Sequence, residues 1–299
     1  MKVSIMGTNG FLSNTIAKYC NKRGYHLDMY GLEKPKSHEF DNFYNVDLIK
    51  NQLDYSSLIT SDIIVYCIGA GIQSNLKESC SLIYELNVNS PVRICNDLKL
   101  NNYLGVFVSF GSFFEIGETD KRTPFTERDI INSCFPVAND YSVSKRMFSR
   151  FVDSYKHAFT HWHFFLPTIY GEGENPLRLI PYTINSIKNK TSIHFTSGEQ
   201  IRQYLYVDEV ARIIDISYQK KLQSGFYNIE GTDTISVKQL VKLIYSYFGK
   251  QLPIDCFGTE KRADVGMKYL SLDGIKLEKL IGYKPSMRIL SQLDNYQMI

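Results

Sequence analysis

Val3-Ser4-Ile5-Met6-Gly7-Thr8-Asn9-Gly10-Phe11-Leu12-Ser13 is a short apolar run, then a glycine turn, then the start of a helical pattern over residues 16–20. In this order the glycines allow a tight turn and let the backbone approach a pyrophosphate, and the helix N-terminus supplies free N–H groups. A serine takes the place of the last glycine and is small enough for close helix packing. We therefore predict a dinucleotide-binding turn rather than a plain β-turn.

Strands and helices alternate after this turn. Apolar runs predict strands at residues 25–30, 45–48, 63–68 and 105–112, and a helix is predicted at residues 82–100. Pro91 lies inside that helix and indicates a kink or two abutting helices. A strand that is apolar throughout suits a parallel sheet buried on both faces. The predicted fold class is α/β, with a Rossmann-like doubly wound parallel sheet.

The residues at the end of the second predicted strand indicate which nicotinamide cofactor is bound. In a dinucleotide-binding unit an acidic residue at this position bonds the 2′-hydroxyl of the adenosine ribose. Here the position is Gly31, with Lys34 and Lys36 just beyond, which leaves room and charge for a 2′-phosphate. We predict NADP(H). Glu33 supports NAD(H), the second choice, if the strand runs two residues further.

Composition limits the possible partners. The 299 residues carry a net charge of +3, with 43% hydrophobic and 22% charged residues, as in an ordinary globular protein. The charge is too small to indicate nucleic acid, and the apolar runs are too short to span a bilayer. The six cysteines form no C-x-x-C pair, which indicates free thiols in a reducing compartment. We predict a cytoplasmic protein with a small-molecule partner and no membrane or nucleic-acid partner.

The histidines do not indicate a metal. His157, His161 and His163 are clustered, but no carboxylate or cysteine partner lies nearby in sequence. We interpret them as surface or packing residues rather than ligands. No other metal-ligand spacing is present, and no metal is predicted.

Tyr141-Ser142-Val143-Ser144-Lys145 contains a candidate catalytic pair. Residues four apart share a helix face, so the Tyr141 phenol and the Lys145 ammonium can point into one site. A phenol has a reference pKa of about 10, and a nearby cation lowers that pKa toward the working range. The spacing alone is more typical of a solvated helix start, so the assignment depends on the surrounding motifs.

The glycine turn, the strand ending in Ser112 and the Tyr-x-x-x-Lys pair together resemble the extended short-chain dehydrogenase/reductase family of nucleotide-sugar epimerases, dehydratases and reductases. The resemblance runs nearly the length of the chain. It implies that Tyr141 donates or accepts a proton, that Lys145 orients the nicotinamide ribose, and that Ser112 is the catalytic hydroxyl. Ile116 stands where the family's Ser-x-x-x-Tyr-Gly segment has tyrosine.

The resemblance also implies cofactor contacts. Asp47 matches the family's adenine-contacting acid, and Asn87 matches the asparagine of its Asn-Val-x-Gly-Thr motif, although Ser90-Pro91 replaces Gly-Thr. The predicted cofactor-binding residues are Gly7, Thr8, Asn9, Gly10, Phe11, Leu12, Gly31, Lys34, Asp47, Leu48, Ile68, Gly69, Asn87, Tyr141, Lys145, Pro167 and Ile169.

The second half of the chain supplies candidate substrate contacts. In the family, the arginine that matches Arg202 binds the diphosphate of the sugar nucleotide. A guanidinium suits this role because it makes charge-assisted, often bidentate hydrogen bonds to phosphate. Arg262 lies in a segment that resembles the family's late Arg-x-x-Asp. The predicted substrate-binding residues are Phe113, Phe114, Thr168, Arg178, Arg202 and Arg262.

The family pattern further implies two domains. Residues 1–165 would bind NADP, with residues 195–225 returning to that domain. Residues 166–194 and 226–299 would form a smaller C-terminal α/β domain that binds the nucleotide sugar. By analogy with the family, we expect a homodimer.

The residues after Ser112 separate the family's reactions. Dehydratases place Asp and Glu there, whereas this chain has Phe113-Phe114 with Glu115 one position late. GDP-fucose-synthase-like enzymes use a cysteine at the position of Phe113. A 4-epimerase normally keeps NAD tightly bound, and the predicted NADP(H) argues against one.

The run Ser197-Gly198-Glu199-Gln200-Ile201-Arg202 resembles CDP-abequose synthase-type 4-ketoreductases. We predict NADPH-dependent reduction of the 4-keto group of a CDP- or dTDP-linked 4-keto-6-deoxy or 3,6-dideoxyhexose, for O-antigen sugar biosynthesis. The alternatives are a nucleotide-sugar 4-epimerase with tightly bound NAD and, of another class, a non-catalytic NADP-binding regulator on the same fold.

Overall fold

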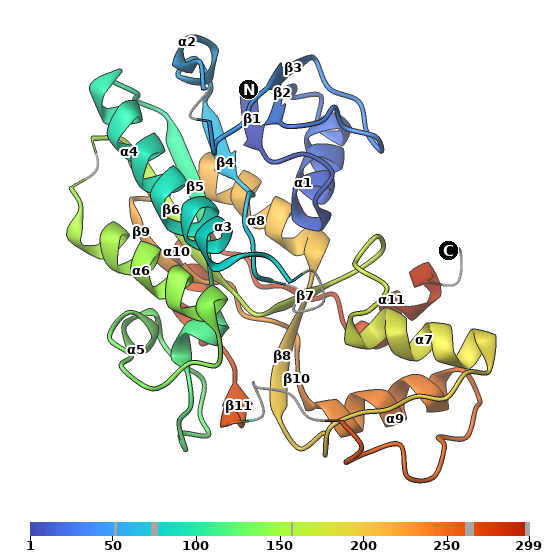
Figure 1. Ribbon diagram of the computed structural model, residues 1–299. Helices are drawn as coiled ribbons and strands as arrows, with labels where there is room; N and C mark the ends of the chain where they lie inside the picture. The colour runs from blue at the N-terminus through green and yellow to red at the C-terminus, as the bar shows by residue number, and fades with distance from the viewer. Residues whose placement is uncertain (51–52, 73–76, 157, 261–265, 297–299) are drawn as a thin grey trace.

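A seven-stranded sheet forms the larger part of the molecule in the computed structural model (Figure 1). The structure describes residues 1–299 except 51–52, 73–76, 157, 261–265 and 297–299. The strand order is β3-β2-β1-β4-β5-β6-β9, and each pairing is parallel. The strands are β1 (Lys2–Met6), β2 (His26–Gly31), β3 (Asn42–Asn45), β4 (Ile63–Tyr66), β5 (Val106–Ser112), β6 (Thr160–Leu166) and β9 (Gly225–Asn228). This is the doubly wound order of dinucleotide-binding domains, as predicted.

Helices cover both faces of this sheet (Figure 1). On one face α1 (Phe11–Lys22), α8 (Val207–Gln219) and α10 (Ile275–Ile281) bury their apolar residues against the sheet. On the other, α4 (Ser90–Leu100) contributes Ile94, Cys95 and Leu98 to a second apolar cluster, and α6 (Asp140–Ser154) lies beside it. Burial on both faces explains why β4 is apolar and why every residue of β5 is buried, Ser109 and Ser112 included.

The helix predicted over residues 82–100 forms without a break at Pro91. It consists of α3 (Cys80–Tyr84), a π-helical turn (Glu85–Asn89) and α4. Pro91 lies in the first turn of α4, where its missing N–H costs least. The π-helical turn holds one residue more than an α-helical turn. It places Asn87 beside the loop that follows β4, and such turns are common at functional sites.

A smaller four-stranded sheet follows. In it β8 (Ile201–Tyr206) pairs with β7 (Thr168–Tyr170), β10 (Asp233–Ser236) and β11 (Tyr269–Leu270). The helices α7 (Leu179–Asn189), α9 (Val237–Tyr247) and α11 (Ile289–Gln292) pack on it, with the 3-10 turn Leu293–Tyr296. The positions of two strands differ from the predicted domain division. β8, predicted in the NADP-binding domain, belongs to this smaller sheet, and β9, most of which was predicted in the sugar-binding domain, pairs with β6 in the large sheet.

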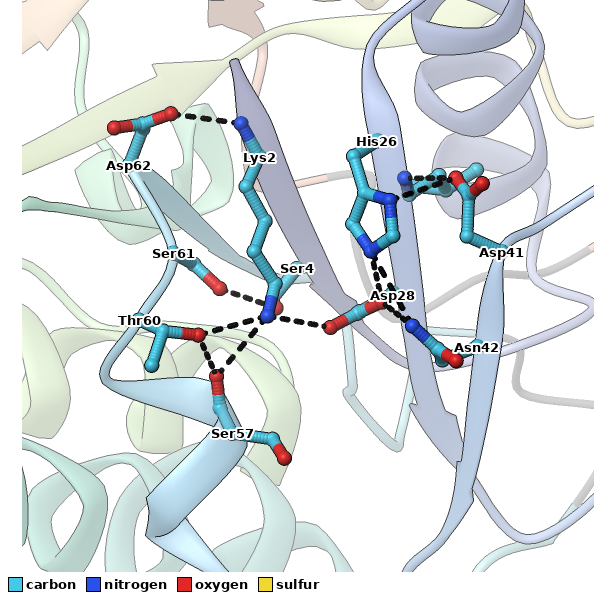
Figure 2. Close-up of polar contacts among 11 residues, drawn as sticks. Lys2, Ser4, His26, Asp28, Asp41, Asn42, Ser57, Thr60, Ser61 and Asp62 are labelled. Atoms are coloured by element: carbon cyan, nitrogen blue, oxygen red, sulfur yellow. Dashed lines mark hydrogen bonds and ion pairs between the residues drawn. The ribbon is translucent and has the colours of Figure 1, made fainter.

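A polar cluster crosses the N-terminal ends of β1, β2 and β3 (Figure 2). At its centre is Asp28, which is 0% exposed. The Lys2 ammonium lies 3.0 Å from Asp28 Oδ2, His26 Nε2 lies 3.1 Å from Oδ1, and Asn42 donates to Oδ1 at 2.8 Å. The Lys2 ammonium also donates to the Thr60 hydroxyl at 2.7 Å. The cluster joins three strands at their N-terminal ends, whereas the glycine turn lies at the opposite, C-terminal end of β1. Its role is therefore structural.

The part of the chain that the structure describes contains no helix both long and apolar enough to cross a membrane. In the same part, no three His, Cys, Asp or Glu side chains come together to hold a metal ion.

Candidate active site

The glycine turn lies between β1 and α1. Gly7 has φ +104° and donates its N–H to the Tyr30 carbonyl at 2.7 Å, and a Cβ at Gly7 would lie 3.1 Å from Ile68 Cγ1. Gly10 is the N-cap of α1, and the first turn of the helix has no acidic residue. The open N–H groups and the dipole of this helix end favour an anion. The turn therefore has the geometry that a pyrophosphate needs.

At the end of β2, Gly31 lies against Thr8. A Cβ at Gly31 would lie only 2.7 Å from Thr8 Oγ1, so a larger side chain would displace Thr8. Asn9 ties the turn to the following loop, because it accepts the Lys36 N–H at 2.9 Å and donates to the Lys34 carbonyl at 3.1 Å. The Glu33 carboxylate pairs with the Lys36 ammonium at 2.7 Å. The Lys34 side chain is exposed on this loop.

Asn87 connects the loop after β4 to α6. Its side chain is 2% exposed, accepts the Ala70 N–H at 3.0 Å and donates to the Ala70 carbonyl at 2.9 Å. It also donates to Ser144 Oγ at 2.9 Å, and the Ser144 hydroxyl donates to the Tyr141 carbonyl at 2.8 Å. The predicted cofactor residues Ile68 and Gly69 stand in this loop. One asparagine thus fixes the cofactor-side loop relative to the helix that carries Tyr141.

Ser112, Tyr141 and Lys145 meet at the carboxyl end of β5. Ser112 is the last residue of β5, and α6 begins at Asp140 after its N-cap Asn139. The Ser112 hydroxyl acts on the Tyr141 phenol and lowers its pKa. The Lys145 ammonium donates to the Phe110 carbonyl at 2.8 Å and lies 5.9 Å from the centroid of the Tyr141 ring.

The electrostatics of Tyr141 differ from what the sequence led us to expect. Burial raises the pKa of Tyr141 to about 12, against the hydrogen bond from Ser112 and the charge of Arg178, which both lower it. Burial also lowers the pKa of Lys145. We expected Lys145 to lower the phenol's pKa, but desolvation outweighs any such effect here. Tyr141 therefore holds its proton at neutral pH and is set up as an acid.

The residues after Ser112 do not bring an acid or base into the site. Phe113 is 1% exposed and packs with Ile116 and Phe165 in an apolar cluster, so its ring offers little surface to a ligand. Phe114 is partly exposed, and the centroid of its ring lies 6.0 Å from the guanidinium carbon of Arg202. The Glu115 carboxylate is buried and accepts the Ser112 N–H at 2.7 Å.

The candidate substrate arginines have different surroundings. Arg202, on β8, is 4% exposed and donates to the Met267 carbonyl at 2.7 Å. Arg178 is the N-cap of α7, and its Nε lies 3.3 Å from Glu174 Oε2. Glu174 accepts a hydrogen bond from the Tyr296 hydroxyl near the C-terminus. The charge of Arg178 also lowers the pKa of Tyr141. Arg262 lies outside the described residues.

The remaining predicted residues lie at the carboxyl ends of other strands. Asp47 and Leu48 follow β3. Asp47 Oδ1 accepts the Ile49 N–H at 3.0 Å, and Leu48 is buried in the apolar cluster beneath. Pro167 follows β6, whose Leu166 pairs with Ser112, and β7 then carries Thr168 and Ile169. Phe11 and Leu12, in the first turn of α1, are partly buried. Residues 7–12, 47–48, 68–69 and 167 thus follow the carboxyl ends of strands of the large sheet, whereas Thr168 and Ile169 belong to the second sheet.

Two residues of this site were missed in the reading of the sequence. Ser144 contacts both Asn87 and Tyr141, and the Glu115 carboxylate bonds the Ser112 backbone. Ser144 had one available signal, because it lies between Tyr141 and Lys145 and on the buried side of α6. The role of Glu115 had none, since a carboxylate at that position usually lies in solvent.

The fold is the doubly wound parallel sheet of dinucleotide-binding domains. Residues 3–229 match the NAD dependent epimerase/dehydratase family, and the chain belongs to this family. Its members include oxidoreductases, epimerases and dehydratases. The open helix end and the glycine turn fit the pyrophosphate of a nicotinamide dinucleotide.

Relatives within the family have different activities. CDP-abequose synthase of Salmonella typhimurium is 24% identical over 95% of this chain and 93% of its own length. A dTDP-D-glucose 4,6-dehydratase of Dictyostelium discoideum is 26% identical over 78% of the chain, which spans 58% of that enzyme's length. A Bacillus cereus UDP-glucuronic acid 4-epimerase, solved with NAD, superposes with TM-score 0.83 at 17% identity over 100% of this chain and 99% of its own. The last likeness establishes the fold alone.

Proposed function

We propose that this chain reduces the 4-keto group of a nucleotide-linked 4-keto-6-deoxy or 3,6-dideoxyhexose. The observation that carries the proposal is the meeting of Ser112, Tyr141 and Lys145 at the carboxyl end of β5, where the Glu115 carboxylate of the following turn is buried and bonded to the Ser112 N–H. Elimination of water needs an acid and a base at that point. Reduction of a ketone needs one proton donor beside the oxygen, which this geometry provides.

The chain's own groups have distinct roles. The glycine turn and the N-terminus of α1 would hold the pyrophosphate, and a bound nicotinamide would supply the hydride to carbon 4. As charge develops on the carbonyl oxygen, the Ser112 hydroxyl donates a hydrogen bond to it and Tyr141 transfers its proton to it. The Lys145 ammonium stabilises the phenolate left on Tyr141 until a proton from solvent restores it.

The substrate class is supported by the second sheet and by one relative. Arg178 and Arg202 would bind the diphosphate, and Phe114 would face the deoxygenated part of the sugar, which lacks hydroxyls that need partners. CDP-abequose synthase aligns with nearly the whole chain. This assignment implies a role in surface-polysaccharide sugar biosynthesis.

The cofactor is proposed to be NADPH. Gly31 leaves no carboxylate at the 2′-position, and Lys34 is exposed on the adjoining loop. The Lys34→Ala variant should weaken NADPH binding roughly fivefold and leave NADH binding unchanged, because a 2′-phosphate loses one exposed cation. Titration calorimetry with both nucleotides measures this. Lys268→Ala, which removes an exposed lysine just before β11, is the matched control. Equal losses for NADPH and NADH would contradict the assignment.

A 4-epimerase with tightly bound NAD is the second candidate. The Glu33–Lys36 ion pair favours it, because the pair occupies a cation that a 2′-phosphate would use. One assay separates the candidates: the purified protein is mixed with NADPH and a CDP- or dTDP-linked 4-keto-6-deoxyhexose, and the nicotinamide absorbance is followed. Stoichiometric loss of NADPH supports the reductase, and product without that loss supports the epimerase. Cofactor binding without any reaction supports a non-catalytic regulator.

A further inference from the structure

A buried chain of hydrogen bonds runs beneath the candidate site. Glu115, in the 3-10 turn Phe113–Ile116, is 1% exposed. Its Oε1 accepts the Ser112 N–H at 2.7 Å, and its Oε2 accepts the Ser149 hydroxyl at 2.7 Å. Ser149 follows Tyr141 and Lys145 at four-residue intervals on α6, so the three share a helix face. One carboxylate therefore joins the end of β5 to the helix of the candidate catalytic pair.

The chain continues into the sheet through two histidines. His163 Nε2 lies 3.1 Å from Ser149 Oγ, and His163 Nδ1 lies 2.8 Å from Ser109 Oγ. Ser109 Oγ lies in turn 2.7 Å from His161 Nε2. His161 and His163 are 1% and 0% exposed. The interpretation of His161 and His163 as packing residues is thus incomplete, because both also take part in a chain of hydrogen bonds.

Which groups donate and which accept along these hydrogen bonds depends on the charge of Glu115. A serine hydroxyl has one hydrogen, and Ser149 gives it to an ionised Glu115. His163 must then donate from Nε2 to Ser149 and accept at Nδ1 from Ser109. A neutral group at position 115 that donates to Ser149 reverses each of these bonds. The tautomer of His163 therefore reports the state of residue 115.

Several charged groups surround Glu115. The charges of Lys145 and Arg146 on α6 act on it through space, and Arg146 also donates to the Glu115 carbonyl at 2.6 Å. Burial raises the pKa of Glu115 to about 7, although the bonds from Ser149 and Ser112 and these two cations lower it. An ionised Glu115 in turn raises the pKa of Lys145 against its burial, as does Cys67 beyond β4. It also raises the pKa of Tyr141.

We propose that Glu115 is a positioning residue for this site: its carboxylate fixes the Ser112 backbone and keeps the buried Lys145 ammonium charged, and Ser149 with His163 holds that carboxylate in place. The inference rests on the proposed function, in which Ser112 and Lys145 act at the substrate oxygen. A charged Lys145 is needed there because it stabilises the phenolate that Tyr141 leaves after giving up its proton. Desolvation alone would favour a neutral amine.

The test is the near-isosteric Glu115→Gln variant in the full chain. The Lys145 titration is followed without substrate by NMR of ¹³C-labelled lysine, and its midpoint should fall by roughly one to three pH units, the usual effect of a close opposite charge. In ¹⁵N spectra His163 should change from the Nε2–H to the Nδ1–H tautomer. With substrate, the alkaline limb of the kcat profile should move down by the same amount.

Glu115→Asp is the matched control, because it keeps the charge and shortens the reach. Its Lys145 midpoint should stay near that of the wild type while kcat falls, and it also serves if the glutamine variant does not fold. An unchanged Lys145 midpoint in Glu115→Gln, or a midpoint that falls equally in Glu115→Asp, overturns the proposal. Shifted midpoints in a protein inactive on 4-keto sugars would reject the proposed reaction and leave the Glu115–Lys145 coupling supported.

Discussion

The Tyr141→Phe variant is expected to lose at least about 100-fold in kcat for ketone reduction, the lower end of what general acid catalysis contributes. The ring that packs beside Lys145 remains, but the proton beside the substrate oxygen is gone. NADPH affinity should be unchanged, because the hydroxyl bonds Ser112 rather than the glycine turn. Single-turnover NADPH oxidation measures the first quantity and fluorescence titration the second.

The pH profile adds a second readout to the Tyr141 experiment. Because burial raises the pKa of Tyr141 to about 12, the phenol remains protonated across the neutral range, and no rate loss below about pH 10 should come from its ionisation. Tyr247→Phe, which removes a hydroxyl at the end of α9, is the matched control and should be fully active. A Tyr141→Phe enzyme with near wild-type kcat would exclude Tyr141 as the proton donor.

Local patterns predicted the parts of the site that depend on neighbours in sequence. The glycine turn followed by α1 and the helix face shared by Tyr141 and Lys145 need only the order of residues and the helical period. Strand ends were less certain: the third strand was predicted at residues 45–48 and forms at Asn42–Asn45. The last bond of its ladder runs from the Val46 N–H to the Gly31 carbonyl, and the strand ends because the chain then turns at Asp47, whose Oδ1 accepts the Ile49 N–H.

Contacts between distant segments were beyond the sequence. Glu115 meets Ser149 across 34 positions, and Asn87 meets Ser144 across 57. No periodicity encodes such pairings, because they follow from which strand neighbours which in the sheet. The pKa of Tyr141 failed as a prediction for the same reason, since desolvation depends on everything packed around the phenol. Predicting these features requires the tertiary structure itself.

The Lys2→Met variant is expected to lower the free energy of unfolding by about 3 kcal/mol, the lower end for breaking a buried ion pair, since Lys2 is partly exposed. Asp28 is fully buried, and its Oδ2 faces the Lys2 ammonium at 3.0 Å. Methionine keeps most of the side-chain volume but leaves that carboxylate without its cation. Urea unfolding followed by circular dichroism measures the loss. Activity at low temperature should persist, because the cluster lies at the edge of the sheet away from the site.

The cost in Lys2→Met should come from the unpaired charge rather than from lost packing. The double variant Lys2→Met/Asp28→Asn should therefore recover much of the loss, since an amide at position 28 is cheaper to bury than a carboxylate without a cation. Lys36→Met is the matched control, because the Lys36–Glu33 pair is exposed and should contribute little. If Lys2→Met were no less stable than Lys36→Met, the Lys2–Asp28 pair would not stabilise the N-terminal edge of the sheet. If the double variant were as unstable as Lys2→Met, the loss would lie in the other contacts of Lys2, chiefly its bond to Thr60.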